Sequence, residues 1–414
     1  MSLNAQLSQR PGGVVRVTAA YTVVAIATQT RWAVQPLLEK WRPLSVHRYF
    51  LPLLIGLNVA LGFVWALSRQ RSLQDLGSFL HSGAAYREGL NPYGYYSWLS
   101  PPPISSDALN LNPPISVYAF QALARFEPGL IQYAFLGSSV AFLGASVALL
   151  LREYPRERSV LTLLTILSLA GVWHTFAYLQ IYAPLVLVVT VSWLLMRRGN
   201  LLLAGVAIGL VIAMKPNFAI WPLILLAAGH RQTPIAALAT AATVSVIPLL
   251  LDGVTIYRQW LNLTMSFSGV EWTSNASIIS LTSRLGSPIA GVVLTGALLA
   301  WLLARLRGTR PDLLYASSLA IPAVLLAGPA SWAGYTLFLL PVLLSRRWTG
   351  PIWVSVLLLA VPFSLVKSVS GLGPIGNALA GPIYVWAVLL LLLTLVWERK
   401  QRTGQGLQQL PEAA

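Results

Sequence analysis

One acidic side chain is placed where it could act as a base. Asp75 follows the first long apolar run by a few residues, which puts it near a membrane–water boundary. A lone carboxylate held near hydrocarbon has a raised pKa, and a raised pKa suits a general base. Asp75 could equally be a solvated loop acid or a partner of Arg71 or Arg87. The residue is therefore a catalytic candidate with a structural alternative.

A second group could hold phosphate. Lys215 lies in Met214-Lys215-Pro216-Asn217, at the end of one apolar run and just before the next helix. The free N–H groups and partial positive charge of a helix N-terminus near Asn217, together with a lysine, favour a phosphate group. The alternative is a lysine that extends to the interface from the end of a membrane span.

Two more helix starts and one turn carry polar groups. Asn112, before two prolines, and Ser331 are predicted to cap helices, so these N-termini are further phosphate candidates. Trp332 and Tyr335 could stack on a sugar or belong to the interfacial aromatic belt. His174 and nearby Gln180 are intramembrane polar candidates, although a buried hydrogen-bonded pair explains them as well.

The composition indicates which class of protein positions these groups. Of the 414 residues, 56% are hydrophobic and 10% are charged, against roughly 25% charged in a soluble domain. We therefore predict an all-α polytopic integral membrane protein, which excludes a soluble enzyme, a coiled coil and a disordered chain. The net charge of +16 is attributed to basic loops that fix topology, and we expect no nucleic-acid partner. With no cysteine, the chain has neither disulfides nor a thiolate nucleophile.

About twelve transmembrane helices are predicted, with a first run from Tyr49 that acts as an uncleaved signal anchor. The expected spans are 49–67, 130–151, 159–177, 180–196, 200–214, 217–229, 234–251, 288–306, 312–328, 331–345, 350–366 and 375–397. Several are shorter than the roughly 20 residues that a lone helix needs to cross a bilayer. Such helices are tolerable inside a bundle.

The basic residues set the predicted orientation. With the N-terminus in the cytoplasm, most Lys and Arg residues fall on inner loops, as the positive-inside rule requires. This gives a cytoplasmic segment 1–48, a transmembrane domain 49–397 and a cytoplasmic tail 398–414. Large outer loops cover 68–129 and 252–287, and residues 112–126 form a juxtamembrane helix that does not cross. We therefore expect the active site on the extracytoplasmic side of a plasma membrane.

Several motifs are absent from the sequence. It contains no Asp-x-Asp pair, no Walker loop, no dinucleotide fingerprint and no zinc-protease helix. A nucleotide-sugar donor held through a metal by paired acids is therefore not favoured, and we expect no metal and no cofactor. A lipid monophosphate donor needs no acidic pair, because one lysine and helix N-termini can hold its charge. No internal repeat is evident, which argues against a carrier built from duplicated halves.

An ordered set of motifs resembles glycosyltransferase family 87, of the GT-C superfamily. These motifs are Asp75 with its small-residue helix, Glu88-Gly89-Leu90-Asn91-Pro92-Tyr93, Asn110-Leu111-Asn112-Pro113-Pro114, Lys215-Pro216 and Pro329-Ala330-Ser331-Trp332. The resemblance runs from about residue 50 to residue 397. It implies a GT-C fold with juxtamembrane helices in a large first outer loop, and it matches Asp75 to the general base of an inverting reaction.

The resemblance also implies substrates. The donor would be a sugar, mannose first, on a polyprenyl phosphate, and the acceptor a lipid or glycan in glycolipid biosynthesis, with membrane lipid around both. Phosphate would be held by Lys215, Asn217, Asn112 and Ser331. Sugar or acceptor contacts would come from His81, Tyr86, Asn91, Tyr93, His174, Trp332 and Tyr335. Where the family often has His after Ser-Trp, this chain has Ala333, Gly334 and Tyr335, so Tyr335 or His174 would take that place.

Two alternative functions remain open on the sequence. A transporter or flippase of lipid-linked sugars fits the number of spans, but its pathway would need polar residues on both sides of the membrane. Here the polar motifs gather on one side, while the inner loops are basic only. A non-catalytic binder of lipid-linked sugar is also compatible with the missing His.

Overall fold

The computed structural model describes residues 46–69, 74–99, 109–155, 159–267 and 271–408. In those ranges the regular elements are helices, and an isolated bridge pairs Asn275 with Trp332. The all-α prediction is thereby confirmed. Residues 1–45, most of the predicted cytoplasmic segment, and 409–414 lie outside the described residues. The chain divides into two units, Met1–Leu54 and Ile55–Ala414, and the second contains the core and the site described below.

Five described helical stretches are long and apolar enough to cross a membrane, or up to seven if two bent pairs each count as one span. This supports the predicted polytopic membrane protein. The five stretches lie in α2 (Val46–Arg69), α5 (Pro128–Glu153), α11 (Gln232–Ser266), α13 (Pro288–Leu306) and Pro374–Glu398, which covers α18 (Pro374–Leu379) and the start of α19 (Ile383–Gln408). The bent pairs are α6 (Val160–Ser168) with α7 (Ala170–Tyr178), and α16 (Gly350–Leu359) with α17 (Phe363–Ser370).

Shorter apolar helices fill the remaining predicted spans. They are α8 (Tyr182–Arg197), α9 (Leu201–Met214), η4 (Pro216–Ala219) with α10 (Ile220–Ala227), α14 (Leu313–Ala327), and η6 (Ala333–Leu339) with α15 (Leu340–Leu344). Each of the twelve predicted spans thus contains a helix, while the count of twelve crossings stays a prediction. The span predicted at 350–366 is not one helix. It bends by 80° between α16 and α17, because Pro362 disfavours helical backbone at the residue before it.

The described part of the predicted first outer loop forms short helices that pack together. α3 (Gln74–Arg87) lies against α4 (Ile115–Leu123), and Gly83 allows the two backbones to approach closely. A short 3-10 turn, η2 (Ser97–Leu99), lies between them in the chain. α3 ends at Arg87, where Gly89 adopts φ 69° and the N–H of Leu90 returns to the carbonyl of Ala85. The predicted helix at 112–126 is found as α4.

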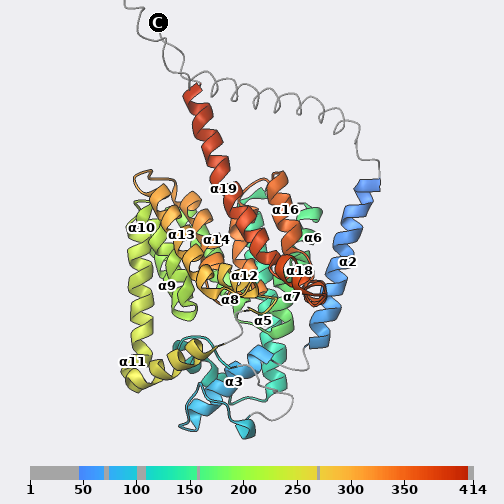
Figure 1. Ribbon diagram of the computed structural model, residues 1–414. Helices are drawn as coiled ribbons and strands as arrows, with labels where there is room; N and C mark the ends of the chain where they lie inside the picture. Colours follow the sequence, from blue (N-terminus) through green and yellow to red (C-terminus); the bar gives the residue numbers. More distant parts are fainter. Residues whose placement is uncertain (1–45, 70–73, 100–108, 156–158, 268–270, 409–414) are drawn as a thin grey trace, which may run out of the picture. The chain divides into compact units, whose positions relative to one another are not determined.

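The segment predicted as the second outer loop begins as a helix. α11 continues to Ser266 but changes direction at Gly253, whose φ of 67° and ψ of −163° are essentially restricted to glycine. Figure 1 shows this bend at the lower end of α11, on the side of the molecule where α3 lies. Ile256 beyond the bend packs with Tyr93 and Val117. The outer part of α11 therefore covers α3 and α4, and α12 (Ile278–Arg284) follows it in the chain.

The core lies among the short helices. Most of α14 is buried against α8, α10 and α19. α9 packs along α11, where Gly205 and Gly209 lie against the backbone carbonyls of Thr233 and Ala237. Small residues permit this close approach between apolar helices. These contacts hold the short helices in place, so that they can position polar groups at their ends.

Candidate active site

Asp75 lies in the first turn of α3 and is partly buried. The side-chain amide of Gln180 donates a hydrogen bond to Oδ2, while Oδ1 receives none from a described residue. Burial raises the pKa of Asp75 from 3.8 to about 6, and the Gln180 hydrogen bond and the charge of Lys215 both lower it. The result is a carboxylate that is mostly ionised at neutral pH, with one oxygen free to take a proton.

Gln180 reaches Asp75 because of an unusual turn. α7 ends at Tyr178, and Leu179 adopts the left-handed conformation with φ 51°, while the N–H of Gln180 bonds to the carbonyl of Thr175. A bulky residue with positive φ is strained, and such strain often marks a functional site. The sequence singled out Gln180 only as an intramembrane polar group. Its link to Asp75 comes from the structure.

Lys215 is buried between α9 and η4. Its Nζ lies 5.1 Å from the ring centre of Tyr182 and 5.3 Å from that of Tyr335. These are cation–π distances. Within the described chain, Nζ has no hydrogen-bond or ion-pair partner, and it makes no direct ion pair with Asp75. The ammonium is held by aromatic faces, so its N–H groups remain available to an anion.

Asp75 and Lys215 line the same cavity, which has a volume of about 360 Å³. The predicted candidates Asn112, His174 and Trp332 line it too. This volume is within the range of about 300–1,000 Å³ typical of small-molecule sites. The structure therefore brings together groups that are separated by up to 257 positions in the chain.

An aromatic wall closes one side of this cavity. Trp332 lies 5.5 Å from Trp272 between ring centres, with Phe267 edge-on to both. All three line the cavity, so the aromatic faces are available to the apolar face of a sugar ring. His174 contributes a buried ring whose Nδ1 has no hydrogen-bond partner, with Tyr178 at 4.6 Å between ring centres.

The predicted cap by Ser331 is wrong. η6 begins after Trp332 without a side-chain cap, and the Ser331 hydroxyl donates to the carbonyl of Gly328. Ser331 is instead tied to the second outer loop. Its N–H donates to Oδ1 of Asn275 at 3.1 Å, and its carbonyl accepts from the N–H of Ala276 at 2.6 Å. This pairing positions Trp332 on the cavity wall, and the Asn217 amide lies close to Gly328 behind it.

The predicted cap by Asn112 is also wrong. The N-cap residue of α4 is Pro114, with no side-chain cap. The backbone N–H and side-chain amide of Asn112 both donate to Oδ1 of Asn110. The Asn110 amide in turn donates to Ser82 of α3 and to Ser116 of α4. These bonds fix the loop before α4 against α3 and place Asn112 on the cavity wall.

Four predicted sugar contacts do not line this cavity. His81 Nε2 accepts the N–H of Tyr96 at 3.2 Å, and burial lowers the pKa of His81. The Tyr86 hydroxyl donates to Asp252 at 2.9 Å, and the Tyr93 hydroxyl donates to the carbonyl of Asn112 at 3.1 Å. Asn91 accepts the N–H of Tyr93 at 3.0 Å. Their observed bonds build the outer layer. Tyr335 lies beneath Lys215 rather than on the cavity surface.

These features define a polytopic helical membrane protein with a carboxylate and an unpaired lysine facing one cavity. The sequence model of glycosyltransferase family 87 matches residues 110–329, which is more than half of the chain. The chain belongs to this family, and membership supports a membrane glycosyltransferase. The match includes Lys215 and His174, whereas Asp75 precedes it and Trp332 follows it. No curated protein and no solved structure matched.

Proposed function

We propose that this protein transfers a hexose, most readily mannose, from a polyprenyl-phosphate donor to a hydroxyl of a lipid or glycan acceptor. The reaction takes place on the extracytoplasmic side of the plasma membrane and inverts the anomeric centre. One observation carries the proposal: in a family 87 chain, a carboxylate with a free oxygen and an ammonium without a direct ion pair line one cavity. A general base and a phosphate ligand are the two groups that such a transfer needs.

The proposed step uses this pair directly. Asp75 Oδ1 takes the proton of the acceptor hydroxyl as its oxygen attacks the anomeric carbon from the face opposite the phosphate. The bond between that carbon and the phosphate oxygen breaks, and its electron pair leaves with polyprenyl phosphate. Attack from the opposite face inverts the configuration. Asp75 then returns its proton to water.

Electrostatic interactions in the cavity also favour departure of the phosphate. As the bond breaks, negative charge grows on the phosphate, and a preorganised cation in a dry site stabilises it more than water does. Lys215 meets this need because its Nζ lies against the faces of Tyr182 and Tyr335 and makes no direct ion pair. As supporting groups, Asn217 follows it in the η4 turn, Asn112 lines the cavity, and Ser331 directly precedes the cavity-lining Trp332. A monophosphate held in this way requires no acidic pair.

The test compares Asp75→Asn with the unaltered protein in lipid, with polyprenyl-phosphate-linked mannose, glucose and arabinose as donors. We expect Asp75→Asn to abolish transfer and to leave donor binding intact, because amide for carboxylate keeps the shape but removes the base. Glu127→Gln is the control, since Glu127 is an exposed acid of the same predicted outer loop. Near-normal turnover of Asp75→Asn would remove Asp75 from the mechanism.

A further inference from the structure

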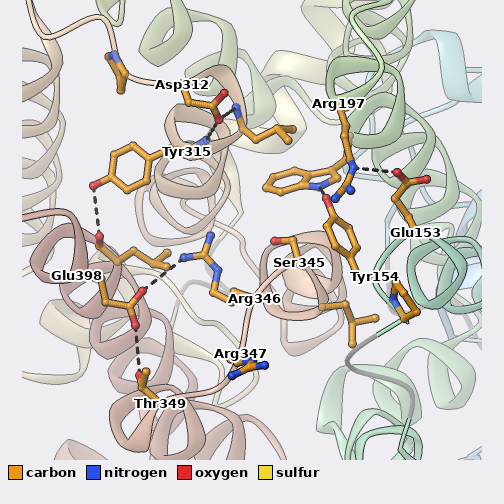
Figure 2. Close-up of a pocket in the computed structure, with 16 residues that line it drawn as sticks. Glu153, Tyr154, Arg197, Asp312, Tyr315, Ser345, Arg346, Arg347, Thr349 and Glu398 are labelled. Atoms are coloured by element: carbon orange, nitrogen blue, oxygen red, sulfur yellow. Dashed lines mark hydrogen bonds and ion pairs between the residues drawn. The ribbon is translucent and has the colours of Figure 1, made fainter. Parts of the chain in front are cut away.

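Charged side chains also line cavities away from the active site. In the cavity of about 840 Å³ that Figure 2 shows, Arg197 pairs with Glu153 at 2.8 Å and Arg346 pairs with Glu398 at 3.9 Å. These pairs join α5 to α8 and the segment after α15 to α19. The charges of that cavity therefore connect helices. A different cavity holds polar groups that the protein engages less completely.

This cavity has a volume of about 600 Å³ and lies where the end of α3, the end of α4 and the bend of α11 meet. We call it the outer cavity. None of its lining residues lines the active-site cavity. Its polar lining residues include Tyr86, Arg87, Arg125, Asp252, Thr255 and Gln259.

Part of the outer cavity is fixed by internal hydrogen bonds. The Asp252 carboxylate accepts from the hydroxyl of Tyr86 at 2.9 Å and from the hydroxyl of Tyr118. Nη1 of Arg87 donates to the carbonyl of Ala124 at 3.2 Å. Because a carboxylate and a guanidinium each make several hydrogen bonds at once, these bonds position both groups without using up their capacity.

Other groups of the same wall are free. The side chains of Arg125, Thr255 and Gln259 make no hydrogen bond or ion pair with a described residue. The arginine only donates hydrogen bonds, whereas threonine and glutamine side chains both donate and accept them. The outer cavity therefore presents donors and acceptors together, some of them preorganised and others free.

This mixture favours a carbohydrate over other classes of ligand. Each hydroxyl of a sugar is both a donor and an acceptor, and Tyr86 adds aromatic surface to the wall. A small anion would meet the Asp252 carboxylate in the same cavity as the arginines. An apolar ligand would remove water from the polar groups and leave them without partners. A neutral glycan satisfies donors and acceptors alike.

The outer cavity is linked to the active site along two helices. On α11, Thr255 and Gln259 line the outer cavity, and Leu263 lines the active-site cavity one turn further on. A spacing of four residues places these three on one face of the helix. Asp75 and Tyr86 lie near opposite ends of α3, about 16 Å apart along its axis at 1.5 Å per residue. A chain of several sugars spans this distance, whereas a single sugar does not.

We propose that the outer cavity is an acceptor subsite for a neutral glycan. It binds sugars several units away from the hydroxyl that attacks at Asp75, and it thereby selects a carbohydrate chain over a simple lipid alcohol. The bend of α11 serves this recognition, because it sets Asp252 and Thr255 on the cavity wall. This inference rests on the proposed transfer function, since it names the class of acceptor.

The first test measures binding without donor, by isothermal titration calorimetry of the full-length protein in lipid nanodiscs. Linear tetrasaccharides of mannose and of glucose are compared with the methyl glycosides of the single sugars. We expect at least one tetrasaccharide to bind about tenfold more tightly than its single sugar. Arg125→Gln and Gln259→Met should each weaken that binding about two- to tenfold, since one net hydrogen bond contributes a factor of this size. Arg258→Gln and Gln132→Met make the same replacements outside both cavities and serve as controls.

Transfer kinetics then separate a subsite from a folding defect. With polyprenyl-phosphate-linked mannose as donor, both variants should raise KM for the tetrasaccharide. They should leave kcat/KM for the methyl glycoside unchanged, because the short acceptor does not reach the outer cavity. Equal losses with both acceptors, equal losses in the controls, or tetrasaccharides that bind no more tightly than single sugars would each overturn the inference. A protein that binds the tetrasaccharide through Arg125 and Gln259 but transfers no sugar would refute the proposed transfer and leave the glycan site in place.

Discussion

Replacing Gln180 with Met tests the proposed base through its hydrogen-bond donor. Met keeps the length of the buried side chain but cannot donate to Asp75. A hydrogen bond to a charged group contributes about 1.5–3 kcal/mol, so its loss should raise the pKa of Asp75 from about 6 to roughly 7–8. At pH 7 the ionised fraction would fall from about nine-tenths to between about one-half and one-tenth.

The assay is the pH dependence of kcat/KM for sugar transfer. We expect a two- to tenfold loss at pH 7, an acid limb that moves to higher pH, and recovery above about pH 9 where Asp75 is ionised again. Gln121→Met, on α4 and outside the cavity, is the matched control. An acid limb that stays in place, or a loss that persists at pH 9, would refute the link between Gln180 and the pKa of Asp75.

Three further predictions use other parts of the site and fold. Burial raises the pKa of Asp75 above its ordinary 3.8, so the contribution of Asp75 to stability is highest below about pH 4 and falls as pH rises through 6. Asp75→Asn should therefore raise the free energy of unfolding at pH 7 by up to about 3 kcal/mol and change it little at pH 4. Melting curves that differ equally at both pH values would contradict this. Lys215→Met should weaken donor binding about 10- to 100-fold, because it removes the proposed charged phosphate ligand. Titration with a non-transferable donor analogue measures the donor affinity. An unchanged affinity would rule out the phosphate role of Lys215. Gly253→Ala should lower the free energy of unfolding by about 1–3 kcal/mol, since its backbone conformation suits glycine only; an unchanged melting temperature would show that α11 can bend otherwise.

The helices were predictable because hydropathy reports them directly. Each predicted span contains a helix, and the short lengths of 200–214 and 217–229 reappear in α9 and α10. The common cavity of Asp75 and Lys215 also followed from sidedness, since both were placed at outer ends of spans. The sequence could not predict which side chains hold Lys215 and Asp75 in place. The cation–π contacts of Lys215 and the Gln180 hydrogen bond to Asp75 join residues far apart in the chain.

The predicted helix caps failed where other side chains engaged the same backbone groups. Asn112 and Ser331 have good capping chemistry, but Asn110 and Asn275 engage their backbone groups. Asn275 itself carried no signal for this role, because its partners are more than 50 positions away. The polar residues from 81 to 93 were expected as sugar or acceptor contacts from the family resemblance. α3 then directs its C-terminal end away from the cavity and into the outer layer.

The aromatic support of Lys215 has a consequence for turnover. In the proposed reaction, Lys215 makes no direct ion pair with an internal carboxylate, so it attracts the leaving polyprenyl phosphate at least as strongly as it attracts the donor. The spent carrier should then compete for the site, and its departure rather than bond cleavage should limit the rate. We therefore expect inhibition by accumulated carrier, so sustained synthesis would depend on continuous recycling of that lipid in the surrounding bilayer.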